Sequence, residues 1–448
     1  MRVRKQTMGW IAGCMLCILI SGISQASGIP AVKKVHWKNG LTFIASEQRH
    51  LPMVYLRLLI KGGSSADPRG KEGLANLTSS LLSSGTRTHT AAEISEALDF
   101  LGASLRSECT EDFSSFSLKV LTKDLNRGIS LLSEILLNPA FPEEEVVKKK
   151  TEIQAAILAK NNDPGEVAQR AFLEALFGDT PYGHPPEGKE TSLPGIGRQD
   201  IVTHYRKYYR PNNAILVAAG DFDLEEFQTL LKSKLAQWAS APVPQEDYRA
   251  DFPESRKIIL KDMSITQANI VLGMQGIKRS NPDYYPLSIM NYILGGGGFA
   301  SRLMEEIRTR RGLAYSVNSV VDARAYPGSF QVVLQTKNES AGKAVELVLG
   351  EIQKIRRSPV SHKELEGAKR YLIGSFPLRL DSNTKLVSFL SLVEFYDLGL
   401  EYMERYPSII RQVSAGEVLR AAGWYLDPDT YVLVVVADQK KADLKGLK

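Results

Sequence analysis

The sequence contains two copies of one pattern, and this internal repeat limits the folds that the chain can adopt. Residues 115–123 read Ser-Phe-Ser-Leu-Lys-Val-Leu-Thr-Lys, and residues 329–337 read Ser-Phe-Gln-Val-Val-Leu-Gln-Thr-Lys. A second pair of segments, residues 211–221 and 428–438, each begins with Pro, continues as an apolar run and ends with Asp. The two pairs have nearly the same separation along the chain. A nearly constant separation between matching segments indicates that the chain contains two copies of one structural unit.

Short apolar runs and amphipathic stretches alternate within a half. Residues 54–60 and 113–121 have the composition or the alternation that is typical of strands. Apolar residues recur at helical spacing in three segments, residues 72–84, 91–101 and 125–137. We therefore expect an α+β fold of two homologous repeats, each an antiparallel-rich sheet with helices packed on one face. The helix at 72–84 should correspond to one at 286–294.

Prolines among polar residues at positions 240–254 are typical of a linker. We place the N-terminal domain at residues 27–245 and the C-terminal domain at residues 255–448. Each domain would then contain one copy of the repeat.

The N-terminus has the pattern of a secretory signal peptide. A basic start precedes an apolar run at residues 8–23, and Ser24-Gln25-Ala26 forms a small-x-small cleavage signal. We expect residues 1–26 to direct export across the inner membrane into the periplasm. An uncleaved membrane anchor is an alternative, because the apolar run is marginally long enough to span a bilayer. Lipidation at Cys14 is another, although little apolar sequence precedes that residue.

The charge balance argues against a general nucleic-acid binder, and the cysteine content argues against a fold held by internal disulfides. Lys and Arg number 56 against 50 Asp and Glu, and three of the cations lie in the leader. The remaining balance lacks the basic bias of a general nucleic-acid binder. Removal of the leader leaves Cys109 as the single cysteine, so no internal disulfide can form in an oxidising compartment.

One segment carries a family resemblance. Residues 73–86 read Gly-Leu-Ala-Asn-Leu-Thr-Ser-Ser-Leu-Leu-Ser-Ser-Gly-Thr. This resembles the active-site helix of the inverzincins, the insulinase/pitrilysin family that includes mitochondrial processing peptidase, in which active members carry H-x-x-E-H. The flanking residues match, but Asn76 and Ser80 stand where the two zinc-binding His would be. Ser79 stands where the general-base Glu would be.

The resemblance also implies a third zinc ligand, a Glu on a downstream helix. That helix is expected at residues 142–160, and Ala156 occupies the ligand position. Lys149 replaces an accessory Glu, and Glu152 is expected to be a solvated helix carboxylate. Catalytic zinc requires three ligands of nitrogen, sulfur or carboxylate type and a base for its water. An amide, two hydroxyls and a methyl group cannot replace them, so no zinc is expected in this chain.

The histidines offer no other metal site. None of the six is spaced i,i+3 or i,i+4 from another, and neither H-x-x-x-H nor C-x-x-C occurs. His184 lies in a segment that resembles a structural loop of the family. We expect it to be an ordinary exposed histidine rather than a ligand.

The second half retains a different motif. Residues 294–303, Leu-Gly-Gly-Gly-Gly-Phe-Ala-Ser-Arg-Leu, precede a charged helix and Gly312-Leu313-Ala314-Tyr315. A Gly-rich run before a helix can bind phosphate, but the Gly-Lys-Ser/Thr of a P-loop is absent. The block resembles the C-terminal signature of the same family. That resemblance implies that Arg308 holds the substrate backbone and Tyr315 donates to the oxyanion. Without the family resemblance, we would expect Arg308 to be a solvated side chain and Tyr315 to be a half-buried side chain with a packing role.

The resemblance covers roughly residues 32–440 and implies a function. In two-subunit members one chain carries H-x-x-E-H and the other does not, and this chain is similar to the zinc-free partner. We expect half of a clamshell chamber, a paralogous H-x-x-E-H subunit that supplies zinc, and a peptide or unfolded polypeptide as substrate. The alternative is a peptide-binding or structural scaffold, comparable to the family's non-catalytic respiratory-complex core subunits. A stand-alone zinc peptidase conflicts with the ligand set.

Overall fold

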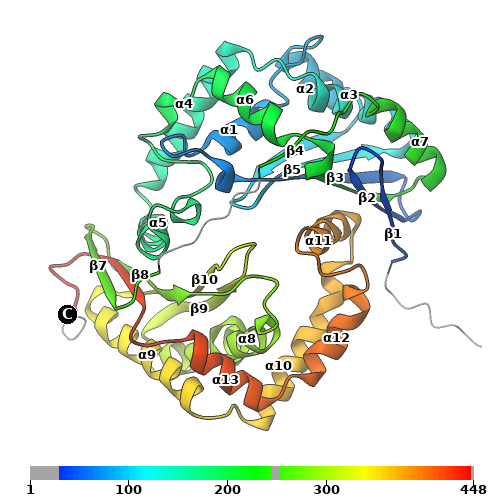
Figure 1. Ribbon diagram of the computed structural model, residues 1–448. Coiled ribbons are helices and arrows are strands. Elements are labelled where there is room, and N and C mark those ends of the chain that lie inside the picture. The colour runs from blue at the N-terminus through cyan, green and yellow to red at the C-terminus, as the bar shows by residue number, and fades with distance from the viewer. Residues whose placement is uncertain (1–29, 245–251, 445–448) are drawn as a thin grey trace, which may run out of the picture.

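The computed structural model describes residues 30–244 and 252–444 (Figure 1), here called the first and second halves. The expected signal peptide and Cys14 lie outside the described residues, as does the middle of the expected linker. Within the described ranges, no helix has the length and apolar content needed to cross a bilayer.

Each half contains one mixed sheet. The first has the order β1-β2-β6-β3-β5-β4, and the second has the order β7-β11-β8-β10-β9. The strands of the first sheet are β1 (Lys33–His36), β2 (Thr42–Glu47), β3 (Met53–Lys61), β4 (Ser104–Cys109), β5 (Phe113–Leu121) and β6 (Ala214–Gly220). Those of the second are β7 (Lys257–Asp262), β8 (Gln267–Gln275), β9 (Ala314–Asp322), β10 (Ser329–Lys337) and β11 (Val432–Ala437).

The two sheets confirm the predicted repeat. The pairs β2–β6 and β7–β11 are parallel, and every later pair in each order is antiparallel. Strand β1 is an additional antiparallel edge strand that the second sheet lacks. The repeated sequences lie on equivalent strands, so that Phe116 on β5 corresponds to Phe330 on β10. The expected α+β fold of two homologous, antiparallel-rich repeats is confirmed.

Helices follow the strands in both halves. The first half contains α1 (Leu74–Leu81), α2 (Ala91–Phe100), α3 (Leu125–Leu137), α4 (Glu143–Lys160), α5 (Pro164–Phe177), α6 (Arg198–Tyr208) and α7 (Leu224–Lys234). The second contains α8 (Tyr284–Asn291), α9 (Ala341–Arg357), α10 (His362–Ser375), α11 (Asn383–Phe395), α12 (Tyr402–Gln412) and α13 (Ala415–Tyr425). Two π-helical segments, η6 (Tyr292–Gly296) and η8 (Met304–Thr309), lie between α8 and β9. Helices α1 and α8 follow the equivalent strands β3 and β8, as the repeat predicts.

One helix of each half packs against the sheet of the other half. Helix α5 contacts β8 and β11, whereas α11 contacts β3 and β6 (Figure 1). The other face of each sheet is covered by helices of its own half, as expected. Both faces of β6 and β11 are therefore buried, and both strands are continuous apolar runs rather than alternating ones.

The alternation of side chains in β11 shows how the two faces are divided. Val432, Val434 and Val436 join the apolar cluster that contains Phe172 and Leu176 of α5. The intervening Leu433 and Val435 face the core of their own half. Helix α5, which belongs to the first half, is therefore buried against the second sheet, and this apolar contact joins the two halves.

Candidate functional site

Helix α1 carries the degenerate zinc motif. Its N-terminus is held by Asp67, whose two carboxyl oxygens accept hydrogen bonds of 2.7 Å from the backbone N–H groups of Gly73 and Ala75. Leu77 and Leu81 are fully buried and anchor the helix on the first sheet. The helix therefore forms from its cap and its apolar face, without help from a metal ion.

The side chains at the expected ligand positions have no metal-binding chemistry. Asn76 and Ser80 are half-buried, and Ser79 is buried. The Ser80 hydroxyl donates a 3.1 Å hydrogen bond to the carbonyl of Leu77 on its own helix. This back-bonding occupies the hydroxyl hydrogen within the helix itself.

Helix α4 packs against α1, so the two helices of the family's metal site lie together. Ala156 is on an exposed face of α4, and Lys149 pairs with Glu152 at 2.5 Å. Nowhere in the part of the chain that the structure describes do three His, Cys, Asp or Glu side chains gather closely enough to hold a metal ion. The residues present do not fit zinc, because an amide, two hydroxyls and a methyl group stand in place of its ligands and base.

His184 is buried, which corrects the expectation of an exposed loop histidine. Its ring Nδ1 lies 3.0 Å from the carbonyl oxygen of Pro185, and burial lowers its pKa. The ring helps to line a cavity of about 390 Å³ together with Arg170, Lys189 and Lys261. The residue is held as part of the loop between α5 and α6, and its sequence context alone did not predict the burial.

Arg308 and Tyr315 lie together in the second half. Arg308 is on the π-helical segment η8, and Tyr315 is the second residue of β9. The guanidinium carbon of Arg308 lies 4.9 Å from the centroid of the Tyr315 ring and 4.8 Å from that of Phe299. The cation thus lies against two aromatic rings, which attract it through their negative faces. Phe299 is a member of this cluster that the sequence did not predict.

Both rings of the cluster are exposed to solvent. Tyr315 is 77% exposed and Phe299 is 71% exposed. Among the described residues, no carboxylate forms an ion pair with Arg308, although Arg310, two residues further along the chain, pairs with Glu305 at 3.0 Å. The Arg308 guanidinium therefore keeps N–H donors for a carbonyl or carboxylate oxygen.

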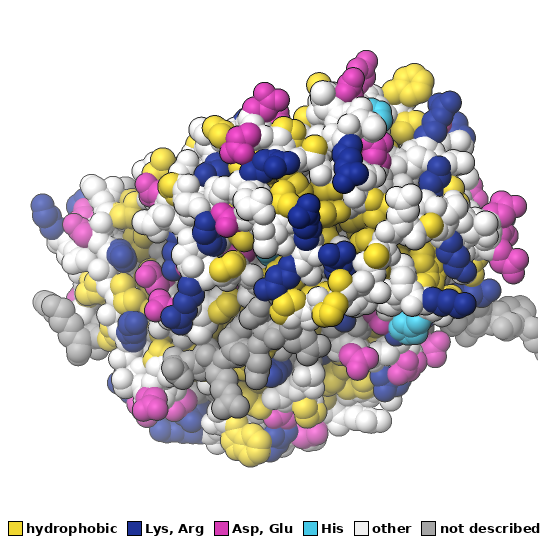
Figure 2. All heavy atoms as spheres, turned by 45° about the horizontal axis from the view of Figure 1, so that its top comes forward, with side chains coloured by type: hydrophobic (Ala, Val, Ile, Leu, Met, Phe, Trp, Pro, Cys, Tyr) yellow, Lys and Arg dark blue, Asp and Glu magenta, His cyan; other side chains and the backbone are white. Residues whose placement is uncertain are grey.

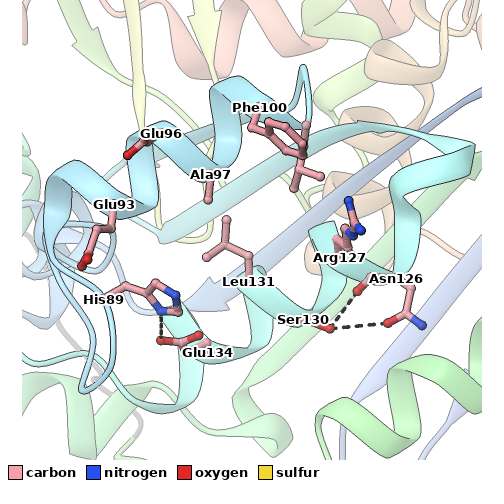
Figure 3. Close-up of a pocket in the computed structure, with 11 residues that line it drawn as sticks. His89, Glu93, Glu96, Ala97, Phe100, Asn126, Arg127, Ser130, Leu131 and Glu134 are labelled. Carbon is pink, nitrogen blue, oxygen red and sulfur yellow. Dashed lines mark hydrogen bonds and ion pairs between the residues drawn. The ribbon is translucent and has the colours of Figure 1, made fainter.

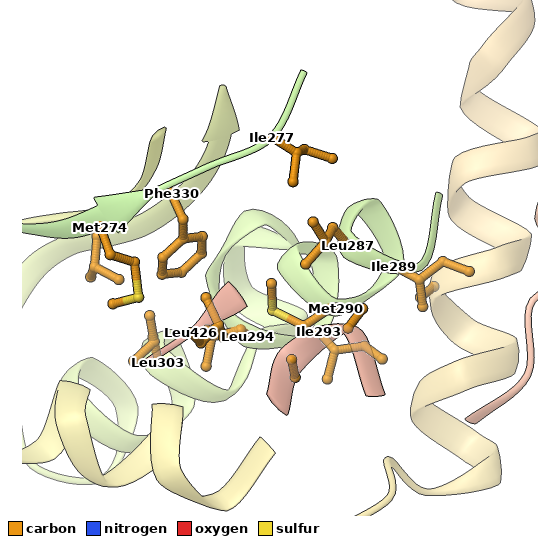
Figure 4. Close-up of a cluster of buried hydrophobic side chains, with 14 of the residues drawn as sticks. Met274, Ile277, Leu287, Ile289, Met290, Ile293, Leu294, Leu303, Phe330 and Leu426 are labelled. Atoms are coloured by element: carbon orange, nitrogen blue, oxygen red, sulfur yellow. The ribbon is translucent and has the colours of Figure 1, made fainter. Parts of the chain in front are cut away.

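Packing beneath the glycine run fixes this cluster in place. Leu294 and Leu303, which flank the run, point into a buried cluster with Met274 and Phe330 (Figure 4). A Cβ atom on Gly295 would lie 2.7 Å from the backbone nitrogen of Ser319 on β9, so only glycine fits there. The run thus serves close packing, and this gives it a role that needs no phosphate.

Gly298 turns the backbone immediately before Phe299. Its φ of +57° lies in the left-handed region that favours glycine, and Phe299 follows directly in a short 3-10 turn. An apolar residue placed immediately after such a glycine is the one sequence signal that could have identified Phe299.

Two family models match the chain. Residues 43–189 match "Insulinase (Peptidase family M16)", and residues 195–372 match "Peptidase M16 inactive domain". The second match contains Phe299, Arg308 and Tyr315, and the first contains α1 and α4. Together the two matches cover most of the described chain.

Individual relatives match nearly the whole chain but have different names. A Helicobacter pylori protein named "Non-peptidase homolog YmxG" is 27% identical over 89% of this chain and 92% of its own length. A Rickettsia bellii protein named "Uncharacterized zinc protease" is 25% identical over 86% of this chain and 92% of its own. A crystal structure titled peptidase M16 inactive domain, from Pseudomonas fluorescens, is 29% identical, with a TM-score of 0.85 over 91% of this chain and 98% of that one.

Proposed function

The chain belongs to the insulinase family of peptidases, peptidase family M16, and on this premise we propose that it is the zinc-free subunit of a secreted heterodimeric metallopeptidase. It is an inactive member of the family, because Asn76, Ser79 and Ser80 cannot bind zinc or activate water. In this proposal a paralogous H-x-x-E-H subunit supplies the metal site. This chain supplies Arg308 and Tyr315, and the substrate is a peptide or an unfolded polypeptide.

The observation that supports a substrate-binding role is the unpaired cation between two exposed rings. Arg308 has neither a carboxylate partner nor full burial in the described structure, so its guanidinium is available to a ligand. Its planar N–H groups can bind the carbonyl oxygens of an extended peptide. The Tyr315 hydroxyl can donate to the oxygen that becomes negative as a peptide bond is attacked.

Such donors need not lie on the chain that holds the metal. Stabilisation of a developing oxyanion depends on where a donor is held, and the segments η8 and β9 that carry this pair are anchored by buried side chains. The absence of zinc ligands from α1 is therefore compatible with a substrate-binding role for the second-half cluster. The expected export signal at residues 1–26 would place such a complex in the periplasm.

The test is purification of the native complex from the source cells, followed by metal analysis and a peptidase assay. We expect a paralogue with H-x-x-E-H to co-purify, and zinc and activity to be present in the complex but absent from this chain alone. Tightly bound zinc in the isolated chain, with activity lost on chelation, would refute the proposal. Isolation of the chain without any such paralogue would favour the scaffold function instead.

A further inference from the structure

A second candidate binding site lies on the outer surface of the first half. A groove of about 640 Å³ runs between α2 and α3, and none of its lining residues belongs to the degenerate zinc motif or to the Arg308 cluster. Ala97, Phe100 and Leu101 from the α2 side and Leu131 from α3 form its apolar part. Figure 3 shows the side chains of Ala97 and Leu131 directed toward the space between the two helices.

Helix α2 is poorly covered by the rest of the chain. Ile94 is its one buried residue, and the Phe100 side chain is 80% exposed. On the face shown in Figure 2, apolar side chains are visible among scattered charged ones. Large exposed aromatic side chains beside an apolar groove are typical of interaction sites, because covering them removes apolar surface from water.

The two ends of the groove differ in charge. Glu93, Glu96 and Glu134 lie toward one end, and Arg127 lies toward the other (Figure 3). Hydrogen bonds from the backbone and side chain of Thr90 lower the pKa of Glu93, which keeps that carboxylate charged at neutral pH. The groove therefore presents a negative end and a positive end to any ligand.

A network fixes Glu134 at the acidic end. Burial opposes its ionisation, but hydrogen bonds from Thr86, Thr88 and His89 outweigh burial and lower its pKa. His89 Nδ1 lies 2.8 Å from the Glu134 carboxylate, and this hydrogen bond raises the pKa of the imidazole. One histidine faces three carboxylates, so the end stays acidic whether or not His89 is protonated.

We propose that this groove binds an amphipathic helical segment of a partner polypeptide. The lining residues recur at one-turn spacing along both helices, as in Glu93, Ala97 and Phe100 of α2 and Arg127, Leu131 and Glu134 of α3. A helix laid along such a groove presents apolar residues at matching intervals. Its apolar face covers Phe100 and Leu131, and its basic end meets the three carboxylates.

The carboxylates at the acidic end of the groove also argue against binding to an anionic lipid surface. An amphipathic surface that binds anionic membranes carries Lys and Arg on its polar side, whereas Glu93, Glu96 and Glu134 would face the headgroups here. Charge complementarity therefore favours a cationic peptide segment over a membrane.

The test uses the chain without residues 1–26 and fluorescein-labelled helical peptides of about 18 residues. The probes carry Leu and Phe on one face and Lys in either the first or the last turn, and matched peptides carry Glu in place of Lys. Fluorescence anisotropy should show that one Lys peptide binds roughly tenfold more tightly than its Glu counterpart. Phe100→Ser should weaken its binding roughly tenfold, because the central aromatic contact is lost. Glu96→Lys should weaken it by a smaller factor that shrinks as salt is added.

Two surface variants outside the groove serve as controls. Asp99→Lys changes charge on α2, and Val147→Ser removes an exposed apolar side chain from α4, so neither should change the affinity. The proposal is overturned if no Lys peptide binds, if the Lys and Glu peptides bind equally, or if Phe100→Ser binds as the wild type does. Preferential binding of phosphatidylglycerol vesicles over the peptides would also overturn it, in favour of a membrane.

Discussion

The backbone N–H of Ala325 donates a 3.0 Å hydrogen bond to the carboxylate of Asp112, and this contact joins the two halves. Asp112 lies in the turn between β4 and β5, and Ala325 lies in the turn between β9 and β10. These are equivalent turns of the repeat, so each copy contacts its counterpart. Arg324 in the second turn also pairs with Glu111 in the first at 2.7 Å.

We predict that Asp112→Ala destabilises the chain. The side chain is 8% exposed, and its loss leaves the half-buried Ala325 N–H without this acceptor. The expected decrease in the free energy of unfolding is about 1–3 kcal/mol. Urea unfolding followed by circular dichroism measures it, with the exposed Asp99→Ala on α2 as the control. Equal stability of the two variants would show that the contact between the turns contributes little.

A second prediction concerns pH and the cap of α1. Burial raises the pKa of Asp67 to about 8, despite the hydrogen bonds from Gly73 and Ala75. The folded state then binds this proton more tightly than the unfolded state, so the stability that Asp67 contributes is greatest at low pH and falls as pH rises from about 4 to about 8. The contribution from this group has a slope of at most about 1.4 kcal/mol per pH unit.

The Asp67→Asn variant tests this titration. The amide cannot ionise, but its oxygen can still accept a hydrogen bond from the helix N-terminus. Urea unfolding at several pH values between about 5 and 8 should therefore give a shallower decline for the variant than for the wild type. Parallel curves for the two proteins would mean that Asp67 does not titrate in this range.

The sequence predicted the repeat and its elements better than it predicted how the halves meet. Spacing identified the strand at 113–121, observed as β5, and the helix at 125–137, observed as α3. Spacing could not reveal that α5 of the first half packs on the second sheet, or that α11 of the second half packs on the first sheet. Periodicity shows that a helix has an apolar face, but it does not show which sheet covers that face.

The sequence likewise identified part of the candidate site, namely Arg308 and Tyr315, but not Phe299. Family resemblance drew attention to Arg308 and Tyr315, and the structure places them in contact. Phe299 was missed because its contact with Arg308 depends on the turn at Gly298 rather than on residue spacing. The substrate-binding roles of the pair stay predictions, and the next two experiments address them.

We predict that Phe299→Ala weakens substrate binding in the complex with a zinc-bearing partner. Removal of one ring from beside the Arg308 guanidinium loses about 0.5–1 kcal/mol of cation–π attraction at an exposed site. KM should therefore rise about two- to fivefold, with a smaller change in kcat. Phe299→Trp should restore KM, because it keeps an aromatic face. An unchanged KM for the alanine variant would mean that the ring does not position Arg308.

The last prediction separates a donor role of Tyr315 from a packing role. Tyr315→Phe removes only the hydroxyl, and the side chain is 77% exposed, so folding and assembly should be unaffected. Loss of one oxyanion donor lowers turnover by about a hundredfold or more, and Arg308→Ala should likewise impair turnover through lost contacts with the substrate backbone. Arg310→Ala is the matched control, because Arg310 pairs with Glu305 and, within the described structure, it is Arg308 rather than Arg310 that lies over the two rings.

Turnover of the reconstituted complex is measured at low and at saturating substrate, and assembly is measured by size-exclusion chromatography. Wild-type turnover by the Tyr315→Phe complex would show that the Tyr315 hydroxyl is not an oxyanion donor and that the side chain has a packing role. Wild-type turnover by both the Tyr315→Phe and Arg308→Ala complexes would leave this chain as a scaffold. A low turnover that is matched by Arg310→Ala would point to disturbance of η8 rather than to lost donors, since that control removes a charge from the adjoining turn without touching the cluster.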